Sequence, residues 1–249
     1  TSLTYDGSPK TATVTSTKID ASYVKVKYYQ GETKVSDPTN AGTYTVKIDV
    51  TESGNYFAAS GLNANDWMFA IAKNTDKPTV TLDPYYSLTY KQSQLTPPVT
   101  VTINGKSLTE NVDYTVTYGK NIDAGELAGS VTINPMGNYE FRQIVRSFTI
   151  DARYIAVTAS DKTSRVGQNL VALTYTCTKG LPYEGDTFTG ELATNANKNT
   201  AGTYQITQGT LSLGNNYNIA FTPGTYTVED KQPQTGFKFE NAAVTKIYG

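Results

Sequence analysis

In the stretch Asn40-Ala41-Gly42-Thr43-Tyr44-Thr45-Val46-Lys47-Ile48-Asp49-Val50, a tight turn leads directly into a strand. The small pair Ala41-Gly42 lets the chain reverse within a short distance. From Tyr44 onward, large apolar residues alternate with polar ones, which is typical of a β-strand with one face in a core. This stretch therefore predicts a β-protein in which a small-residue turn precedes a half-buried strand.

The Ala-Gly turn recurs twice more along the chain. It is found again as Asp123-Ala124-Gly125 and as Thr200-Ala201-Gly202-Thr203-Tyr204, and we call these three segments the corner markers. A second marker follows each corner at an almost constant distance, and we call these segments the turn markers: Gly54-Asn55-Tyr56, Gly137-Asn138-Tyr139 and Gly214-Asn215-Asn216-Tyr217. Such repetition predicts an array of small units, which is usually a spacer, a stalk or a multivalent surface.

The markers divide the chain into repeats of similar length. The predicted domains are repeat 1 (1–73), repeat 2 (77–151) and repeat 3 (152–229), followed by a connector and the truncated start of a further repeat (230–249). The segment between repeats 1 and 2 is polar and contains a proline, as expected of a linker. Repeats 2 and 3 have almost no linker between them, which predicts a stiffer connection.

The composition agrees with small β-domains and excludes several classes of function. The chain has 249 residues, of which 38% are hydrophobic, and its 19 Tyr together with alternating Thr, Val and Ile are typical of strands. A net charge of −1 offers no basic surface for a phosphate backbone, so nucleic acid is not an expected partner. No apolar run is long enough to span a bilayer as a helix.

The chain is predicted not to be an enzyme and to need no cofactor. Histidine is absent, which removes the usual general base, the commonest metal ligand and every Ser-His or Cys-His arrangement. The single cysteine, Cys177, is expected to be a small apolar side chain in a core. Hydrolysis through paired carboxylates remains chemically possible.

We predict an all-β fold of three tandem, small, antiparallel β-sandwich domains of the Ig-like type, in an elongated array. The alternative is a β-grasp-like repeat with one short helix, for which Ser60 to Asp66 is the candidate segment. Asn104-Gly105 is expected to form a tight hairpin turn. Strands are expected at 23–29, 44–50, 67–71, 99–103, 114–118, 147–150, 154–158, 173–177 and 224–228.

The marker residues are predicted to be structural. In Ig-type sandwiches, a tyrosine near the start of a late strand ties its hydroxyl to the backbone of the preceding corner. Tyr44 and Tyr204 fit that place, and Val46 and Ile206, two residues later, are expected in the core. The other structural markers are Gly42, Gly125, Gly202, Tyr56, Tyr139 and Tyr217.

Repeat 3 resembles the MBG family, the mostly-beta, glycine-marked repeats of large bacterial surface proteins. The resemblance rests on Val171-Ala172-Leu173-Thr174-Tyr175-Thr176, Gly180-Leu181, Gly185-Asp186, the stretch from Thr200 to Leu211, and Asn216-Tyr217. Repeat 3 departs from the family at Arg165-Val166-Gly167-Gln168, where such repeats usually have a Tyr-Gly-Asp turn. Repeats 1 and 2 are similar more loosely, through their markers, and Leu127 of repeat 2 replaces the corner tyrosine.

The resemblance implies export to the bacterial cell surface and a role in adhesion or spacing, with no catalytic residues. The predicted function is therefore a non-catalytic structural or adhesive segment, a stalk or display module. Its expected partners are neighbouring repeats of the same chain. The alternative is a module that binds host or cell-surface glycans or matrix proteins through exposed tyrosines, for which the candidates are Tyr28, Tyr29, Tyr85 and Tyr86.

Acidic loop residues are weak candidates for a calcium site. Asp123 and Glu126 lie together before a strand, and Glu184 and Asp186 bracket Gly185. Carboxylate oxygens from loops are typical calcium ligands. None of these segments has the length or regularity of a known calcium loop, so no metal site is predicted.

Overall fold

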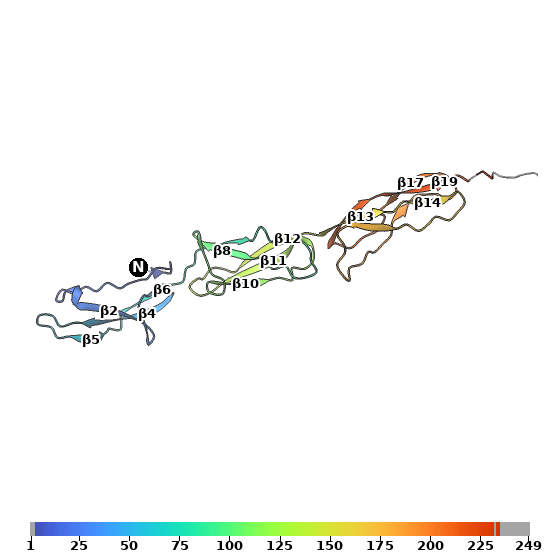
Figure 1. Ribbon diagram of the computed structural model, residues 1–249. Coiled ribbons are helices and arrows are strands. Elements are labelled where there is room, and N and C mark those ends of the chain that lie inside the picture. The colour runs from blue at the N-terminus through green and yellow to red at the C-terminus, as the bar shows by residue number, and fades with distance from the viewer. Residues whose placement is uncertain (1–2, 232, 235–249) are drawn as a thin grey trace, which may run out of the picture. The chain divides into compact units, whose positions relative to one another are not determined.

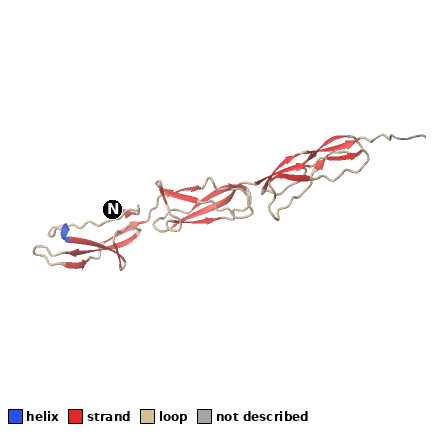
Figure 2. Cartoon of the chain, viewed as in Figure 1, coloured by secondary structure: helices blue, strands red, loops and turns tan. Residues whose placement is uncertain are grey.

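The computed structural model describes residues 3–231, 233 and 234, so the predicted start of a further repeat lies largely outside the described residues. Strands form nearly all of the regular structure, and Figure 2 shows one short helix, Ala21–Tyr23. Contacts group the described residues into two units. Unit 1 consists of the described residues within Thr1–Leu88, Ser93–Ile122 and Glu126–Ile150. Unit 2 consists of Thr89–Gln92, Asp123–Gly125 and the described residues within Asp151–Gly249.

Repeat 1 contains one mixed sheet in unit 1. Its strands are β1 (Leu3–Thr4), β2 (Val24–Gln30), β3 (Thr33–Val35), β4 (Gly42–Val50), β5 (Ala59–Leu62) and β6 (Met68–Ala72). They lie in the order β1-β6-β4-β2-β3, with β5 also paired to β4, and β1 runs parallel to β6. The alternation in β4 buries Tyr44, Val46, Ile48 and Val50.

Repeat 2 places its core between two small sheets of unit 1 (Figure 1). One contains β7 (Thr79–Leu82), β8 (Val99–Ile103) and β9 (Lys106–Ser107), and the other contains β10 (Tyr114–Tyr118), β11 (Gly125–Pro135) and β12 (Ile144–Ile150). Asn104 and Gly105 both have positive φ, 50° and 79°, as a tight hairpin turn requires. Val80, Val101, Val131 and Ile133 meet in the core.

Repeat 3 also has two sheets, both in unit 2. The order β15-β13-β18 joins Tyr175–Lys179, Arg153–Ala159 and Tyr217–Thr222. The order β14-β19-β17-β16 joins Lys162–Arg165, Gly224–Glu229, Gly202–Thr207 and Ala193–Thr194. Strand β13 runs parallel to β18, and β14 runs parallel to β19.

The all-β prediction is confirmed, with two refinements. Three strand pairs, β1–β6, β13–β18 and β14–β19, are parallel, whereas the sequence predicted antiparallel sandwiches. Ser60 to Asp66, the candidate helix of the alternative fold, instead continues β5 and a turn. The short helix lies at Ala21–Tyr23, where the Asp20 carboxylate accepts a hydrogen bond from the Ser22 N–H and caps it.

Candidate functional site

The corner tyrosines of repeats 1 and 3 fix the turn that precedes their strand. The Tyr44 hydroxyl donates to the Asn40 carbonyl at 2.8 Å, and the Tyr204 hydroxyl donates to the Thr200 carbonyl at 3.0 Å. This is the hydrogen bond of a tyrosine corner. The Leu127 side chain, which stands in this place in repeat 2, is exposed and offers no hydroxyl.

The turn markers share a glycine with positive φ and a backbone hydrogen bond that closes the turn. Gly54, Gly137 and Gly214 have φ of 55°, 60° and 75°, in the left-handed region that favours glycine. The N–H of the marker tyrosine donates to the carbonyl three residues earlier, at 3.0, 3.2 and 3.3 Å in the three repeats in chain order. A Cβ added at Gly137 would lie 2.5 Å from the Val112 carbonyl oxygen. This turn therefore presents the asparagine and tyrosine that follow the glycine.

The turn marker of repeat 2 binds the corner marker of repeat 1 inside unit 1. The Asn138 Oδ1 accepts a hydrogen bond from the Ala41 N–H at 2.8 Å, and its Nδ2 donates to Asn40 Oδ1 at 3.0 Å. The Asn138 carbonyl accepts from the linker N–H of Asn74 at 2.9 Å, and the Asn74 carbonyl accepts from the Glu140 N–H at 2.8 Å. A single asparagine thus connects both the corner and the linker to the next repeat.

Unit 2 contains the same set of contacts. The Asn216 Oδ1 accepts from the Ala124 N–H at 2.7 Å, and its Nδ2 donates to Asp123 Oδ1 at 3.3 Å. The Asn216 carbonyl accepts from the Arg153 N–H at 2.9 Å, as that of Asn138 does from Asn74. We call this arrangement, in which a turn marker binds a corner marker, the marker joint.

A pair of tyrosine rings completes each marker joint. Tyr139 meets Tyr5 edge to face with ring centroids 5.5 Å apart, and Tyr217 meets Tyr90 in the same way at 5.5 Å. Such pairs contribute about 0.5–1.5 kcal/mol beyond the burial of their area. The two joints therefore use the same chemical groups at equivalent places in the sequence.

The joint in unit 2 has an additional acceptor. The Asp186 carboxylate accepts hydrogen bonds from the Tyr217 hydroxyl at 2.5 Å and from the Tyr90 hydroxyl at 3.1 Å. The Tyr217 hydroxyl in turn accepts from the Tyr183 N–H at 2.9 Å. Burial, followed by the hydrogen bond to Asp186, raises the pKa of Tyr217 to about 12. Asp186, a calcium candidate in the sequence, here holds two rings in place.

Comparison with known families identifies repeats 1 and 3. Residues 1–65 match the MBG domain, and residues 155–227 match the MBG domain of the YGX type. The chain belongs to the MBG family. MBG domains are repeat modules of large bacterial surface proteins and are not known enzymes. No curated protein and no solved structure gives a significant match to the chain.

Tyr28 and Tyr29, the first pair of predicted ligand-stacking tyrosines in this MBG chain, already contact other groups of the protein. Tyr28 is only 7% exposed, and its hydroxyl accepts a hydrogen bond from the Ala12 N–H at 2.9 Å. Tyr29 is half-buried, and the Lys47 ammonium lies 4.7 Å from the centre of its ring. Burial leaves Tyr28 without a free face for a sugar ring.

The two tyrosines of the second pair, Tyr85 and Tyr86, differ in exposure. Tyr86 is half-buried, and its hydroxyl accepts from the Thr96 N–H at 3.0 Å. Tyr85 is 94% exposed, so its ring is open to solvent. Among the four candidate tyrosines, Tyr85 has the accessible face that stacking on a ligand requires.

The acidic residues considered as calcium ligands either form other contacts within the protein or lie apart from one another. Asp123 accepts from Asn216 in the marker joint, and Glu126 is exposed on β11. Within residues 3–231, 233 and 234, no three His, Cys, Asp or Glu side chains gather where they could hold a metal ion. In the same residues, no helix has the length and apolar character needed to cross a membrane. Cys177 is an unpaired thiol and is half-buried.

Sequence reasoning missed Asn138 and Asn216, the residues at the centre of the two joints. Asparagine is a common turn residue, so its presence in a turn marker suggested only a local role. The constant distance between the corner and turn markers was the available signal. A fixed spacing within each repeat keeps the two markers at defined places, so that the turn of one repeat can meet the corner of another.

Proposed function

We propose that this MBG chain is a non-catalytic stalk or display segment of a protein on the bacterial cell surface, with a role in adhesion. The observation that carries the proposal is the marker joint. The corner and turn markers recur most regularly in the sequence, and they form contacts from one repeat to another through Asn138 and Asn216. Side chains occupied in this way are not available to a substrate.

The proposed mechanism is geometric. Each repeat adds length, and each joint limits bending by holding together a backbone N–H (of Asn74 or Arg153), a corner N–H and a tyrosine ring. A binding element elsewhere in the parent protein is thereby held away from the cell surface. The partners of this segment are accordingly neighbouring repeats.

Small-angle X-ray scattering of the purified chain tests the proposal. A compact globule of this length has a radius of gyration of about 18 Å, whereas a stalk of three repeats exceeds this value clearly. The double variant Asn138→Ala/Asn216→Ala is expected to broaden the distribution of interatomic distances, and the matched variant Asn55→Ala is expected to leave it unchanged. A radius of gyration near that of a globule would rule out the stalk.

A second candidate function is binding of glycans or matrix proteins, favoured by the exposure of Tyr85. The test is a panel of glycans and extracellular-matrix proteins, with and without calcium. A specific interaction that Tyr85→Ala abolishes and Tyr86→Phe retains would make this segment a receptor-binding module. Absence of binding across the panel would support a spacer.

A further inference from the structure

The tight turn Asn104-Gly105 of repeat 2 lies against the linker that leads from repeat 1. This turn joins β8 to β9. The Asn104 Nδ2 donates a hydrogen bond to Asp76 Oδ2, in the linker, at 3.0 Å. The Lys106 ammonium, just after the turn, lies 2.7 Å from the position that a Cβ at Gly7 would occupy. The hairpin of β8 and β9 therefore contacts both the linker and repeat 1.

Asp76 also fixes the conformation of the linker. Its N–H donates to Asn74 Oδ1 at 2.8 Å, and its Oδ2 accepts a hydrogen bond from Asn74 Nδ2 at 3.4 Å. The Asn74 N–H in turn donates to the Asn138 carbonyl in the marker joint. The Asp76 carboxylate thus connects the Asn104 side chain to the residue through which the linker enters the joint.

Asn104 has the surroundings that spontaneous deamidation requires. In this reaction, the backbone nitrogen of the next residue attacks the side-chain carbonyl carbon of asparagine, and a five-membered imide ring forms. Glycine offers the least hindered nitrogen because it has no Cβ, and Asn104-Gly105 is the only Asn-Gly pair of the sequence. Both residues are exposed, and no atom lies within 4 Å of the place of a Cβ at Gly105. In the part of the chain that the structure describes, the Gly105 N–H makes no hydrogen bond.

The tip of the hairpin can rearrange while the sheet behind it stays in place. Ring closure requires the Asn104 side chain to leave Asp76 and to turn toward the Gly105 nitrogen. Strand β9 has only two residues, and two residue pairs join it to β8, so local opening of the tip costs little. Leu108, directly after β9, is buried and its N–H donates to the Val101 carbonyl at 2.9 Å. The core therefore holds the hairpin just beyond the tip.

We propose that Asn104 is a site of spontaneous deamidation, and that the modification breaks the contact between this hairpin and the linker. The Gly105 nitrogen forms a bond to Asn104 Cγ, and the bond from Cγ to Nδ2 breaks. The proton of the Gly105 N–H leaves with Nδ2 as ammonia. Water then opens the imide ring at either carbonyl carbon. One product has aspartate at position 104, and the other has isoaspartate, in which the backbone runs through the former side chain.

Both products carry a carboxylate in place of the amide. The hydrogen bond from Nδ2 to the Asp76 carboxylate is lost, and a second negative charge is added beside the first. Isoaspartate also lengthens the backbone of a two-residue turn, whose geometry sets the register of β8 and β9. The linker is thereby released from the hairpin. This modification does not depend on the proposed role of the chain as a stalk.

Mass spectrometry of the full chain, incubated under native conditions and then digested with trypsin, tests for the modification. The tryptic peptide 92–106 contains Asn104 and no other asparagine. We expect two new forms of this peptide, each heavier by the exchange of NH₂ for OH, and one of them methylated by an isoaspartyl methyltransferase. They should accumulate faster at alkaline pH, because the attacking nitrogen must lose its proton. Asn104→Gln should yield neither form, since its longer side chain does not close a five-membered ring.

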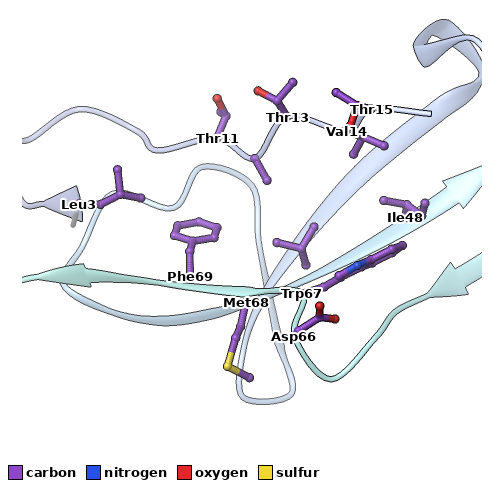
Figure 3. Close-up of a pocket in the computed structure, with 12 residues that line it drawn as sticks. Leu3, Thr11, Thr13, Val14, Thr15, Ile48, Asp66, Trp67, Met68 and Phe69 are labelled. Atoms are coloured by element: carbon purple, nitrogen blue, oxygen red, sulfur yellow. The ribbon is translucent and has the colours of Figure 1, made fainter. Parts of the chain in front are cut away.

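The variant Asn104→Asp reproduces one product and tests the effect on the linker. Hydrogen exchange at the residue 76 N–H should accelerate about threefold, because the carboxylate beside it is repelled and its linker contacts weaken. Asn111→Asp is the matched control, since Asn111 is also an exposed asparagine with positive φ in repeat 2. In an Asp76→Ala background, Asn104→Asp should have no further effect. Emission of Trp67, the only tryptophan, which lines a pocket of repeat 1 (Figure 3), should stay unchanged throughout if repeat 1 keeps its fold.

Three results would overturn the proposal. The first is an unmodified peptide 92–106 from the folded chain after a time in which the same peptide, synthesised and incubated alone, is fully converted. The second is unchanged exchange at residue 76 in Asn104→Asp, which would show that the modification does not reach the linker. The third is an equal acceleration in the Asp76→Ala background, which would show that the effect does not pass through the Asp76 carboxylate.

Discussion

Replacing Asn138 by alanine should open the marker joint of unit 1 while leaving both neighbouring cores intact. The change removes two side-chain hydrogen bonds, to the Ala41 N–H and to Asn40 Oδ1. A net value of about 0.5–1.5 kcal/mol for each bond gives about 1–3 kcal/mol for the pair. Asn138 is half-buried, so we expect a value of about 1.5 kcal/mol, which increases the open population of the joint about tenfold.

Amide hydrogen exchange measured by NMR is the assay for this prediction. The Asn74 and Glu140 N–H groups bond to backbone carbonyls that the substitution retains, so faster exchange at these amides reports opening of the joint. We expect exchange at both amides to accelerate about tenfold in Asn138→Ala. Asn55→Ala is the matched control, since Asn55 has the same place in the turn marker of repeat 1 and is exposed.

Two outcomes would refute the reasoning. Unchanged exchange at Asn74 and Glu140 in Asn138→Ala would show that the side chain contributes nothing to the joint. An equal acceleration in Asn55→Ala would show that the effect arises from loss of the turn itself, and not from a contact between repeats.

Three further predictions concern stability. Tyr44→Phe should lower the free energy of unfolding by about 1 kcal/mol through loss of the hydrogen bond to the corner, as measured by urea denaturation. Because the pKa of Tyr217 is raised from 10 to about 12, the proton is held more tightly in the folded state. Stability should therefore fall by up to about 1.4 kcal/mol per pH unit between pH 10 and 12, and urea midpoints of Tyr217→Phe should lack this component. Leu95→Ala should cost about 2–5 kcal/mol, since Leu95 is 0% exposed, whereas Leu181→Ala, at an exposed site, should change the urea midpoint little.

Alternation of side chains made many of the strands predictable from the sequence. The period of two in Val24–Gln30 and in Gly42–Val50 reflects a sheet with one face in a core, and the structure has β2 and β4 there. The tight turn at Asn104-Gly105 was equally clear, since few residue pairs adopt positive φ at both positions. Local sequence contains the cause of these features.

Pairing direction and the marker joints could not be predicted, because local sequence does not contain their cause. A strand shows the same alternation whether its neighbour is parallel or antiparallel, so β14 gave no sign that it lies parallel to β19. Asn138 bonds to Ala41 across 97 residues of sequence, and no local pattern specifies such a contact. The exposure of Tyr85 and the burial of Tyr28 likewise depend on tertiary packing.

The parallel pair β14–β19 has a mechanical consequence for repeat 3. Lys162–Arg165 is near the start of the repeat and Gly224–Glu229 is at its end, and they lie side by side in the same direction. Tension applied between the two ends of the repeat pulls these strands past each other along their length. Their hydrogen bonds are then loaded together in shear, whereas an antiparallel hairpin pulled from its open end separates one bond at a time. The parallel pairing of these two strands can therefore make a domain resist pulling even when its core is small.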